Sequence, residues 1–182
     1  MFRRREERRE ERETFGRGGD ANRYQMRQKM VSIGDDYWIE NDAGERVFKV
    51  DGKALRLRQT LIFEDAHGHE LAKIQERMLH IRDTMEIEGR DGTHIATVKK
   101  ALISPFRERW TVHVADGPDL DVQGNIVDHE YRIEDGRHKV AEVSKKWFRV
   151  RDTYGVEIEP GQEDVLILAA VVVLDEMAHR SG

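Results

Sequence analysis

The chain has 182 residues, a formal net charge of −5, 37% charged residues and no cysteine. This length suffices for one domain with a sizeable hydrophobic core, and the acidic balance gives no reason to expect a nucleic-acid partner. The lack of cysteine excludes disulfides, thiol nucleophiles and cysteine-based zinc sites.

The first 13 residues, MFRRREERREERE, contain six arginines and five glutamates. They carry no apolar stripe that would dock a helix on a core, although residues of opposite charge can pair at helical spacing. The following Gly16-Arg17-Gly18-Gly19 run is typical of a flexible linker. We therefore predict a disordered or loosely helical tail and linker over residues 1–22. The interleaved glutamates argue against a basic arm at Arg3-Arg4-Arg5 that binds RNA or lipid.

From Tyr24 onward a unit repeats: apolar-x-apolar-Glu, a turn ending in glycine, and then an apolar strand. Its copies are YWIENDAGERVFKV, LIFEDAHGHELAKI, MEIEGRDGTHIATV and YRIEDGRHKVAEV. The turn glycines are Gly44, Gly68, Gly92 and Gly136, at spacings of 24, 24 and 44 residues. Alternating apolar residues on both sides of a glycine turn indicate a β-hairpin in each copy.

The alternation also predicts the register of these strands, because only one face of a strand can enter the core. The residues predicted to face inward are Tyr37, Ile39, Ile62 or its neighbours, Met85, Ile87, Tyr131 and Ile133. The four glutamates of the repeat, Glu40, Glu64, Glu88 and Glu134, are predicted to lie at strand ends and to face solvent.

About 12 strands are predicted in all. They lie near residues 24–31, 36–41, 45–50, 55–64, 70–77, 83–89, 93–101, 108–115, 121–126, 129–135, 138–146 and 151–158. Closing such a meander into a barrel removes its exposed sheet edges. A barrel with more than about eight strands needs more than its own side chains to fill the interior.

A run of ten apolar residues, VLILAAVVVL, occupies positions 165–174. A helix that is apolar all round must be buried on all sides, and ten residues are too few to span a bilayer, which takes about 20. Val171-Val172-Val173 would also suit a buried strand. The length of the run, Ala169-Ala170 and a capping Asp164 favour a helix.

These observations together predict a mainly β fold: a closed antiparallel barrel of about 12 strands that encloses a hydrophobic C-terminal helix. We expect one domain over residues 23–182, with its central helix at about 164–178. No apolar segment follows the charged start of the chain. A cytoplasmic protein without a transmembrane segment is therefore expected.

Basic clusters are the only site-like feature of the sequence. The candidate contacts for an anion or lipid are Lys99, Lys100, Arg107, Arg109, Lys145 and Lys146, and Trp147-Phe148 follows the last pair. An anionic headgroup would need these charges to converge, with aromatic side chains exposed beside them. The alternative is that one lysine of each pair faces solvent as an edge or gatekeeper charge and that Trp147 belongs to the core.

No metal, cofactor or catalytic residue is predicted. His67-Gly68-His69 places two imidazoles on a turn, which is at most half of a tetrahedral site, so a solvated turn is the preferred interpretation. Ser104 precedes Pro105 without the glycine elbow expected of a nucleophilic serine. We therefore expect no enzymatic activity.

Four segments resemble the LURP-one-related proteins: Val50-Asp51-Gly52-Lys53-Ala54-Leu55, Lys99-Lys100-Ala101-Leu102-Ile103-Ser104 before Arg109-Trp110, Ala141-Glu142-Val143-Ser144-Lys145-Lys146-Trp147-Phe148, and Asp152-Thr153-Tyr154-Gly155-Val156. The resemblance spans roughly residues 24–177. That family is similar in fold to the C-terminal domain of tubby proteins and to phospholipid scramblases. The resemblance implies a 12-stranded barrel wrapped around a central C-terminal helix.

The resemblance implies less about function. LURP-one-related proteins have no established enzymatic reaction, whereas tubby domains bind phosphoinositide headgroups and scramblases act at membranes. We expect a non-enzymatic binding or scaffold module, with a protein or an anionic lipid surface as its partner. The alternatives are a peripheral membrane protein that recognises anionic phospholipid headgroups and, as the third hypothesis, an enzyme.

Overall fold

The computed structural model describes residues 20–27, 36–52, 60–76, 84–104, 107–149 and 153–180. The first strand, β1, begins at Asn22, so most of the tail and linker predicted over residues 1–22 lies outside the described residues. The strands are β1 Asn22–Arg27, β2 Tyr37–Asn41, β3 Arg46–Asp51, β4 Thr60–Asp65, β5 Glu70–Glu76, β6 Thr84–Gly89, β7 His94–Ser104, β8 Arg107–Val114, β9 Leu120–Asn125, β10 Glu130–Asp135, β11 His138–Ser144 and β12 Thr153–Ile158. The helix α3, Asp164–Arg180, follows β12.

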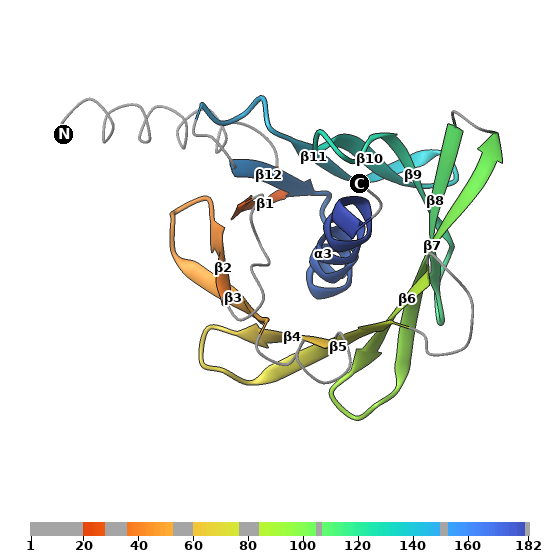
Figure 1. Cartoon of the computed structure of the whole chain (residues 1–182). Coiled ribbons are helices and arrows are strands. Elements are labelled where there is room, and N and C mark those ends of the chain that lie inside the picture. The colour runs from red at the N-terminus through yellow and green to blue at the C-terminus, as the bar shows by residue number, and fades with distance from the viewer. Residues whose placement is uncertain are drawn as a thin grey trace.

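The twelve strands form one closed antiparallel barrel. Each strand pairs with its neighbours in the chain, and β1 completes the ring by pairing with both β2 and β12. Figure 1 shows the strands arranged around α3, which lies in the middle of the ring. The predicted fold, a closed barrel enclosing a hydrophobic C-terminal helix, is confirmed.

The repeated hairpins share a β-bulge at the same place in the motif. In every copy the register shifts between the inward apolar residue and the glutamate that follows it: Ile39/Glu40, Phe63/Glu64, Ile87/Glu88 and Ile133/Glu134. The turn glycines Gly44, Gly68 and Gly92 have φ values of 77°, 84° and 80°, a left-handed conformation that costs glycine little. The repeat of 24 residues is therefore one bulged hairpin used three times.

The predicted register is confirmed wherever the side chains are described. Ile39, Met85, Ile87, Tyr131 and Ile133 are buried. In the second copy the inward residues are Leu61 and Phe63, the neighbours of Ile62, whereas the side chain of Tyr37 lies outside the described residues.

The four glutamates of the repeat are half-buried rather than fully solvent-facing. Neighbouring polar side chains cover two of them on the outer wall. Lys49 Nζ lies 3.0 Å from Glu64 Oε2, and the Gln75 amide donates a hydrogen bond of 2.8 Å to Glu88. These two glutamates thus contact polar side chains of the preceding strand, Lys49 on β3 and Gln75 on β5.

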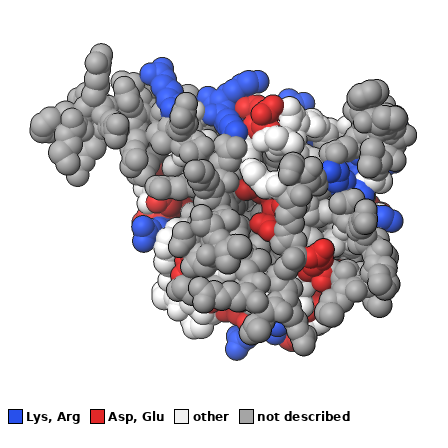
Figure 2. All heavy atoms as spheres, in the orientation of Figure 1, with Lys and Arg blue, Asp and Glu red and all other residues white. Residues whose placement is uncertain are grey.

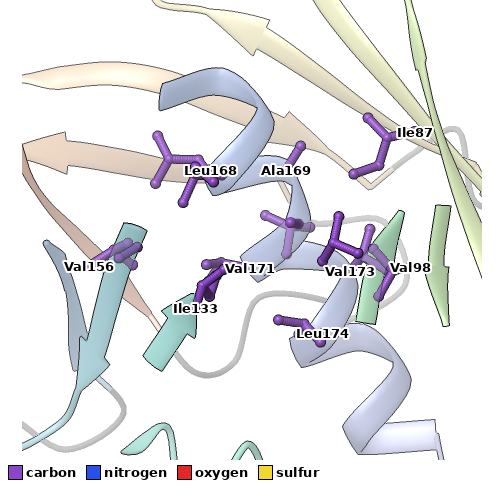
Figure 3. Close-up of a cluster of buried hydrophobic side chains, with 14 of the residues drawn as sticks. Ile87, Val98, Ile133, Val156, Leu168, Ala169, Val171, Val173 and Leu174 are labelled. Atoms are coloured by element: carbon purple, nitrogen blue, oxygen red, sulfur yellow. The ribbon is translucent and has the colours of Figure 1, made fainter. Parts of the chain in front are cut away.

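The helix α3 fills the inside of the barrel. Residues 167–174 are each at most 2% exposed, because strands surround the helix on every side. Figure 3 shows the side chains of Leu168, Val171, Val173 and Leu174 among apolar residues of the wall. The expectation that residues 165–174 are enclosed on all sides holds from residue 167 onward, since Val165 and Leu166 are partly exposed at the entrance.

The first turn of α3 is joined to β1 by hydrogen bonds to the Asp164 carboxylate. Asp164 Oδ2 accepts from the Tyr24 hydroxyl at 2.5 Å and from the Asn22 side-chain amide at 2.8 Å. Burial and this bond to Asp164 raise the pKa of Tyr24. Within the described part of the chain, no helix is long and apolar enough to cross a bilayer.

Candidate functional site

Two basic residues of the β7–β8 hairpin, one part of the predicted anion site, contact neighbouring side chains on the barrel wall: Lys100 and Arg109. Lys99 is exposed, and Lys100 Nζ lies 5.3 Å from the centroid of the Trp110 ring, a cation–π distance. Arg109 Nη2 is 3.0 Å from Asp121 Oδ1. The side chain of Arg107 lies outside the described residues.

Lys145 and Lys146, the other predicted pair, begin the turn that follows β11. The Ser144 hydroxyl lies 3.0 Å from both Glu130 oxygens, and the Lys145 and Lys146 amides donate to Glu130 Oε1 at 3.0 and 3.3 Å. Lys146 Nζ adds a contact of 3.6 Å to Glu130 Oε2. We call these donors, the Ser144 hydroxyl and the two lysine amides, the 144–146 cradle.

The structure does not bring the two lysine pairs together. In the strand register, Lys99 on β7 pairs with Thr111 on β8, which pairs with Asp121 on β9. From the other side, Ser144 on β11 pairs with Glu130 on β10, which pairs with Asn125 on β9. The strands β7 and β11 flank β9 at two strands' distance on either side. Four strand spacings of about 4.8 Å separate the pairs by about 19 Å along the wall.

The exposed charges do not form a field of one sign on the face drawn in Figure 2. Acidic and basic side chains of the described residues are interspersed there. An anion would therefore be recognised by local donors rather than by a broad positive surface.

The His67-Gly68-His69 turn is organised by a carboxylate. Asp65 Oδ1 accepts from the backbone amides of His67 and His69 at 2.8 and 2.9 Å, and Asp65 Oδ2 lies 2.8 Å from His69 Nδ1. The His69 amide is the main reason that the pKa of Asp65 is lowered to about 2. Among the described residues, no group of three or more His, Asp or Glu side chains is placed to hold a metal ion.

A buried polar cluster, absent from the predicted site, lies where the C-terminal part of α3 meets the β9–β10 turn. His129 Nε2 is 2.6 Å from Asp175 Oδ1, and the two side chains are 1% and 6% exposed. The His129 ring stacks on Tyr154 with centroids 4.1 Å apart. On the outer side, His179 Nδ1 contacts the Asp175 carbonyl oxygen at 2.7 Å.

Two buried atoms of this cluster, His129 Nδ1 and the Tyr131 hydroxyl oxygen, have no hydrogen-bond partner among the described residues. Burial, followed by the charge of Asp175, raises the pKa of Tyr131 well above its usual value, so the phenol stays protonated. The cluster supplies an imidazole, a carboxylate and a phenol, but they are enclosed by barrel and helix. The geometry suits a polar link between the β9–β10 turn and α3 better than contact with a bulky substrate.

The backbone around His129 is specialised for this link. His129 has φ 53°, a positive value that is uncommon outside glycine. On the neighbouring strand, a Cβ atom on Gly124 would lie 2.5 Å from the Glu130 carbonyl oxygen, so β9 can approach β10 only because residue 124 is glycine. The aspartate–histidine contact has no local sequence signal, since 46 residues separate its members. The sequence signal that could have indicated the close approach of β9 to β10 was Gly124, a glycine that lies in none of the predicted turns.

A closed antiparallel barrel of twelve strands around an apolar C-terminal helix defines a tubby-like barrel fold. The chain belongs to the LURP-one-related family, whose model matches residues 22–175.

Two known proteins show the extent of the likeness. The uncharacterized protein YxjI of Bacillus subtilis (strain 168) is 29% identical over 152 residues, which cover 84% of this chain and 90% of that protein. A protein of Arabidopsis thaliana solved by X-ray crystallography superposes with a TM-score of 0.64 at 18% identity. The superposition covers 86% of this chain and 90% of the plant protein, and it supports the fold alone.

Proposed function

We propose that the protein is a non-enzymatic binding or scaffold module that recognises its partner with the outer surface of its barrel. The supporting observation is the occupied interior, because residues 167–174 of its own helix are at most 2% exposed. Barrels of other classes use this space for a ligand. Recognition is therefore assigned to the wall and to the strand connections.

The proposal is tested by searching for turnover at the pair that most resembles acid–base machinery. Full-length protein and an Asp175→Asn variant are assayed with chromogenic esters, phosphoesters and glycosides. We expect neither protein to exceed the buffer rate, because His129 and Asp175 are 1% and 6% exposed and cannot reach a bulky substrate. Turnover by the unmodified protein that falls at least tenfold in a folded Asp175→Asn variant would show an enzyme instead.

A second candidate function is peripheral recognition of anionic phospholipid headgroups. Two neighbouring features favour it. Val127, at 60% exposed, is the large hydrophobic residue that the described part of the chain leaves open to solvent. It lies three residues before Glu130, whose carboxylate contacts the Lys145–Lys146 turn. An apolar tip beside lysines is the combination that inserts into an anionic bilayer surface.

Vesicle co-sedimentation tests this second function. We expect full-length protein to sediment with vesicles containing phosphatidylserine and not with neutral phosphatidylcholine vesicles. A Lys145→Glu/Lys146→Glu variant should lose most of this binding, since each basic residue near the surface contributes about 1 kcal/mol. The matched control is Lys99→Glu/Lys100→Glu on β7, which should keep it. Equal sedimentation with both kinds of vesicle, or with neither, contradicts headgroup recognition.

A further inference from the structure

The carboxylate of Glu130 occupies a set of donors that has the chemistry of an anion site. Its two oxygens face the Ser144 hydroxyl at 3.0 Å, the Lys145 amide at 3.0 Å and Lys146 Nζ at 3.6 Å. The Lys146 amide is shared: it donates to Glu130 Oε1 at 3.3 Å and to the Ser144 hydroxyl oxygen at 3.1 Å. Successive backbone amides that converge on one point form the concave nests in which proteins bind phosphate and other anions. An anion is therefore already bound here, and it is a side chain of the protein itself.

The backbone keeps these donors in place. Ser144 is the last residue of β11 and pairs with Glu130 on β10. The turn that follows is closed by the Phe148 amide, which donates to the Lys145 carbonyl oxygen at 3.0 Å. Phe148 is 9% exposed, so the turn ends on a largely buried aromatic side chain. The cradle is thus built by the ladder and the turn and does not depend on Glu130 alone.

Glu130 matches the charge of this site poorly. It carries one negative charge, whereas two lysine side chains extend from the cradle. Lys146 Nζ stays 3.6 Å away and its side chain is 82% exposed, a looser arrangement than the 2.7–2.9 Å of strong charge-assisted bonds. Among the described residues, no carboxylate lies within ion-pair distance of Lys145 Nζ. A phosphate group carries about −1.5 to −2 charges and three acceptor oxygens, and it would satisfy both lysines.

We propose that Ser144, Lys145 and Lys146 form a binding site for a phosphate group and that Glu130 is its displaceable internal occupant. The site goes beyond the binding-module function and does not require a membrane. Glu130 is an autoinhibitory contact: its side chain is 29% exposed, so it leaves the cradle by rotating toward solvent without unfolding the barrel.

The proposal predicts how strongly Glu130 competes. A tethered ligand acts at an effective concentration in the millimolar range or higher, so the unmodified protein binds inorganic phosphate weakly. A Glu130→Ala variant vacates the donors and should bind phosphate at least tenfold more tightly. Glu130→Gln keeps the shape of the side chain but removes its charge, and it should give an intermediate gain.

The experiment follows the backbone amide resonances of Lys145 and Lys146 in full-length protein during titration with inorganic phosphate at constant ionic strength. Saturable shifts at these two amides are expected in Glu130→Ala, and adding Lys146→Glu to that variant should abolish them. The matched control is Glu134→Ala, which removes a half-buried glutamate from the same strand without opening the cradle. It should behave as the unmodified protein does.

The outcome that overturns the site is a folded Glu130→Ala or Glu130→Gln variant whose Lys145 and Lys146 amides do not respond to phosphate. A gain in phosphate affinity that is equally large in Glu134→Ala also overturns it, because loss of net charge alone would then explain the binding.

A second arm identifies the source of the phosphate. Glu130→Ala is sedimented with phosphatidylcholine vesicles that contain or lack a phosphatidylinositol phosphate. Binding to both inorganic phosphate and the phosphorylated vesicles assigns a lipid headgroup as ligand. Binding to inorganic phosphate alone assigns a soluble phosphate-bearing molecule, and it separates this site from the vesicle-binding function proposed above.

Discussion

Leu168→Asp is expected to prevent the barrel from folding. Leu168 is 0% exposed in the second turn of α3 and belongs to the core cluster. Truncating such a leucine to alanine costs about 2–5 kcal/mol, and an unpaired buried carboxylate adds a penalty of several kcal/mol. The sum is comparable to the whole stability of a typical domain, about 5–15 kcal/mol. The variant should be insoluble, or soluble without a cooperative thermal transition.

The matched control is Val127→Asp, which introduces the same charge at a valine that is 60% exposed. Its unfolding free energy should change by no more than about 0.5 kcal/mol, as for most surface substitutions. Ending the chain at Pro160 removes α3 and should reproduce the effect of Leu168→Asp. A cooperative melt of the truncated protein near the midpoint of the full-length protein would show that the helix is not required.

The strand pattern was predictable because a local rule determines it. The repeat of apolar-x-apolar-Glu and a turn glycine indicated the hairpins, and the positive φ of Gly44, Gly68 and Gly92 explains why glycine recurs there. The bulge before each glutamate was not predicted. Alternation of apolar and polar residues does not show where two residues of one strand lie opposite a single residue of its partner strand.

The helix in the barrel was predictable for a different reason. Ten consecutive apolar residues leave no polar face, and in a chain with so many charged residues they require an enclosure. That inference needs no knowledge of how the strands pair. The predicted burial is confirmed for residues 167–174, which the barrel wall encloses. Val165 and Leu166, at the barrel entrance, are only partly buried.

The residues of the candidate functional site could not be predicted from a local sequence pattern. Lys99-Lys100 and Lys145-Lys146 are similar in sequence, but their distance in space depends on the order of five strands around the ring. Residues that become partners only when strands pair or when the helix packs in the barrel have no spacing signal in the sequence. Glu130 meets the amides of Lys145 and Lys146 fifteen and sixteen residues later. His129 meets Asp175 at the far end of α3.

The buried His129–Asp175 contact is expected to join the β9–β10 turn to α3 energetically. Asp175→Leu removes the partner of His129 Nε2. Among the described residues, His129→Leu leaves the Asp175 carboxylate with the half-exposed His179, whose Nδ1 lies 3.3 Å from Asp175 Oδ1. Each single replacement should cost about 2–5 kcal/mol of unfolding free energy, because a buried polar group loses its partner. His129→Leu/Asp175→Leu removes both groups and should cost clearly less than the sum of the two single replacements.

Equilibrium urea denaturation of the four proteins measures this coupling, which we expect to exceed about 1 kcal/mol. The chain offers a control with the same residue types: His113 Nδ1 lies 2.9 Å from Asp119 Oδ2, but the side chains are 47% and 59% exposed. Water screens that pair, so the corresponding leucine variants should show little coupling. If the His129 and Asp175 effects are also additive, the contact does not hold the turn to the helix, and packing of Tyr154 and the apolar core would have to do so.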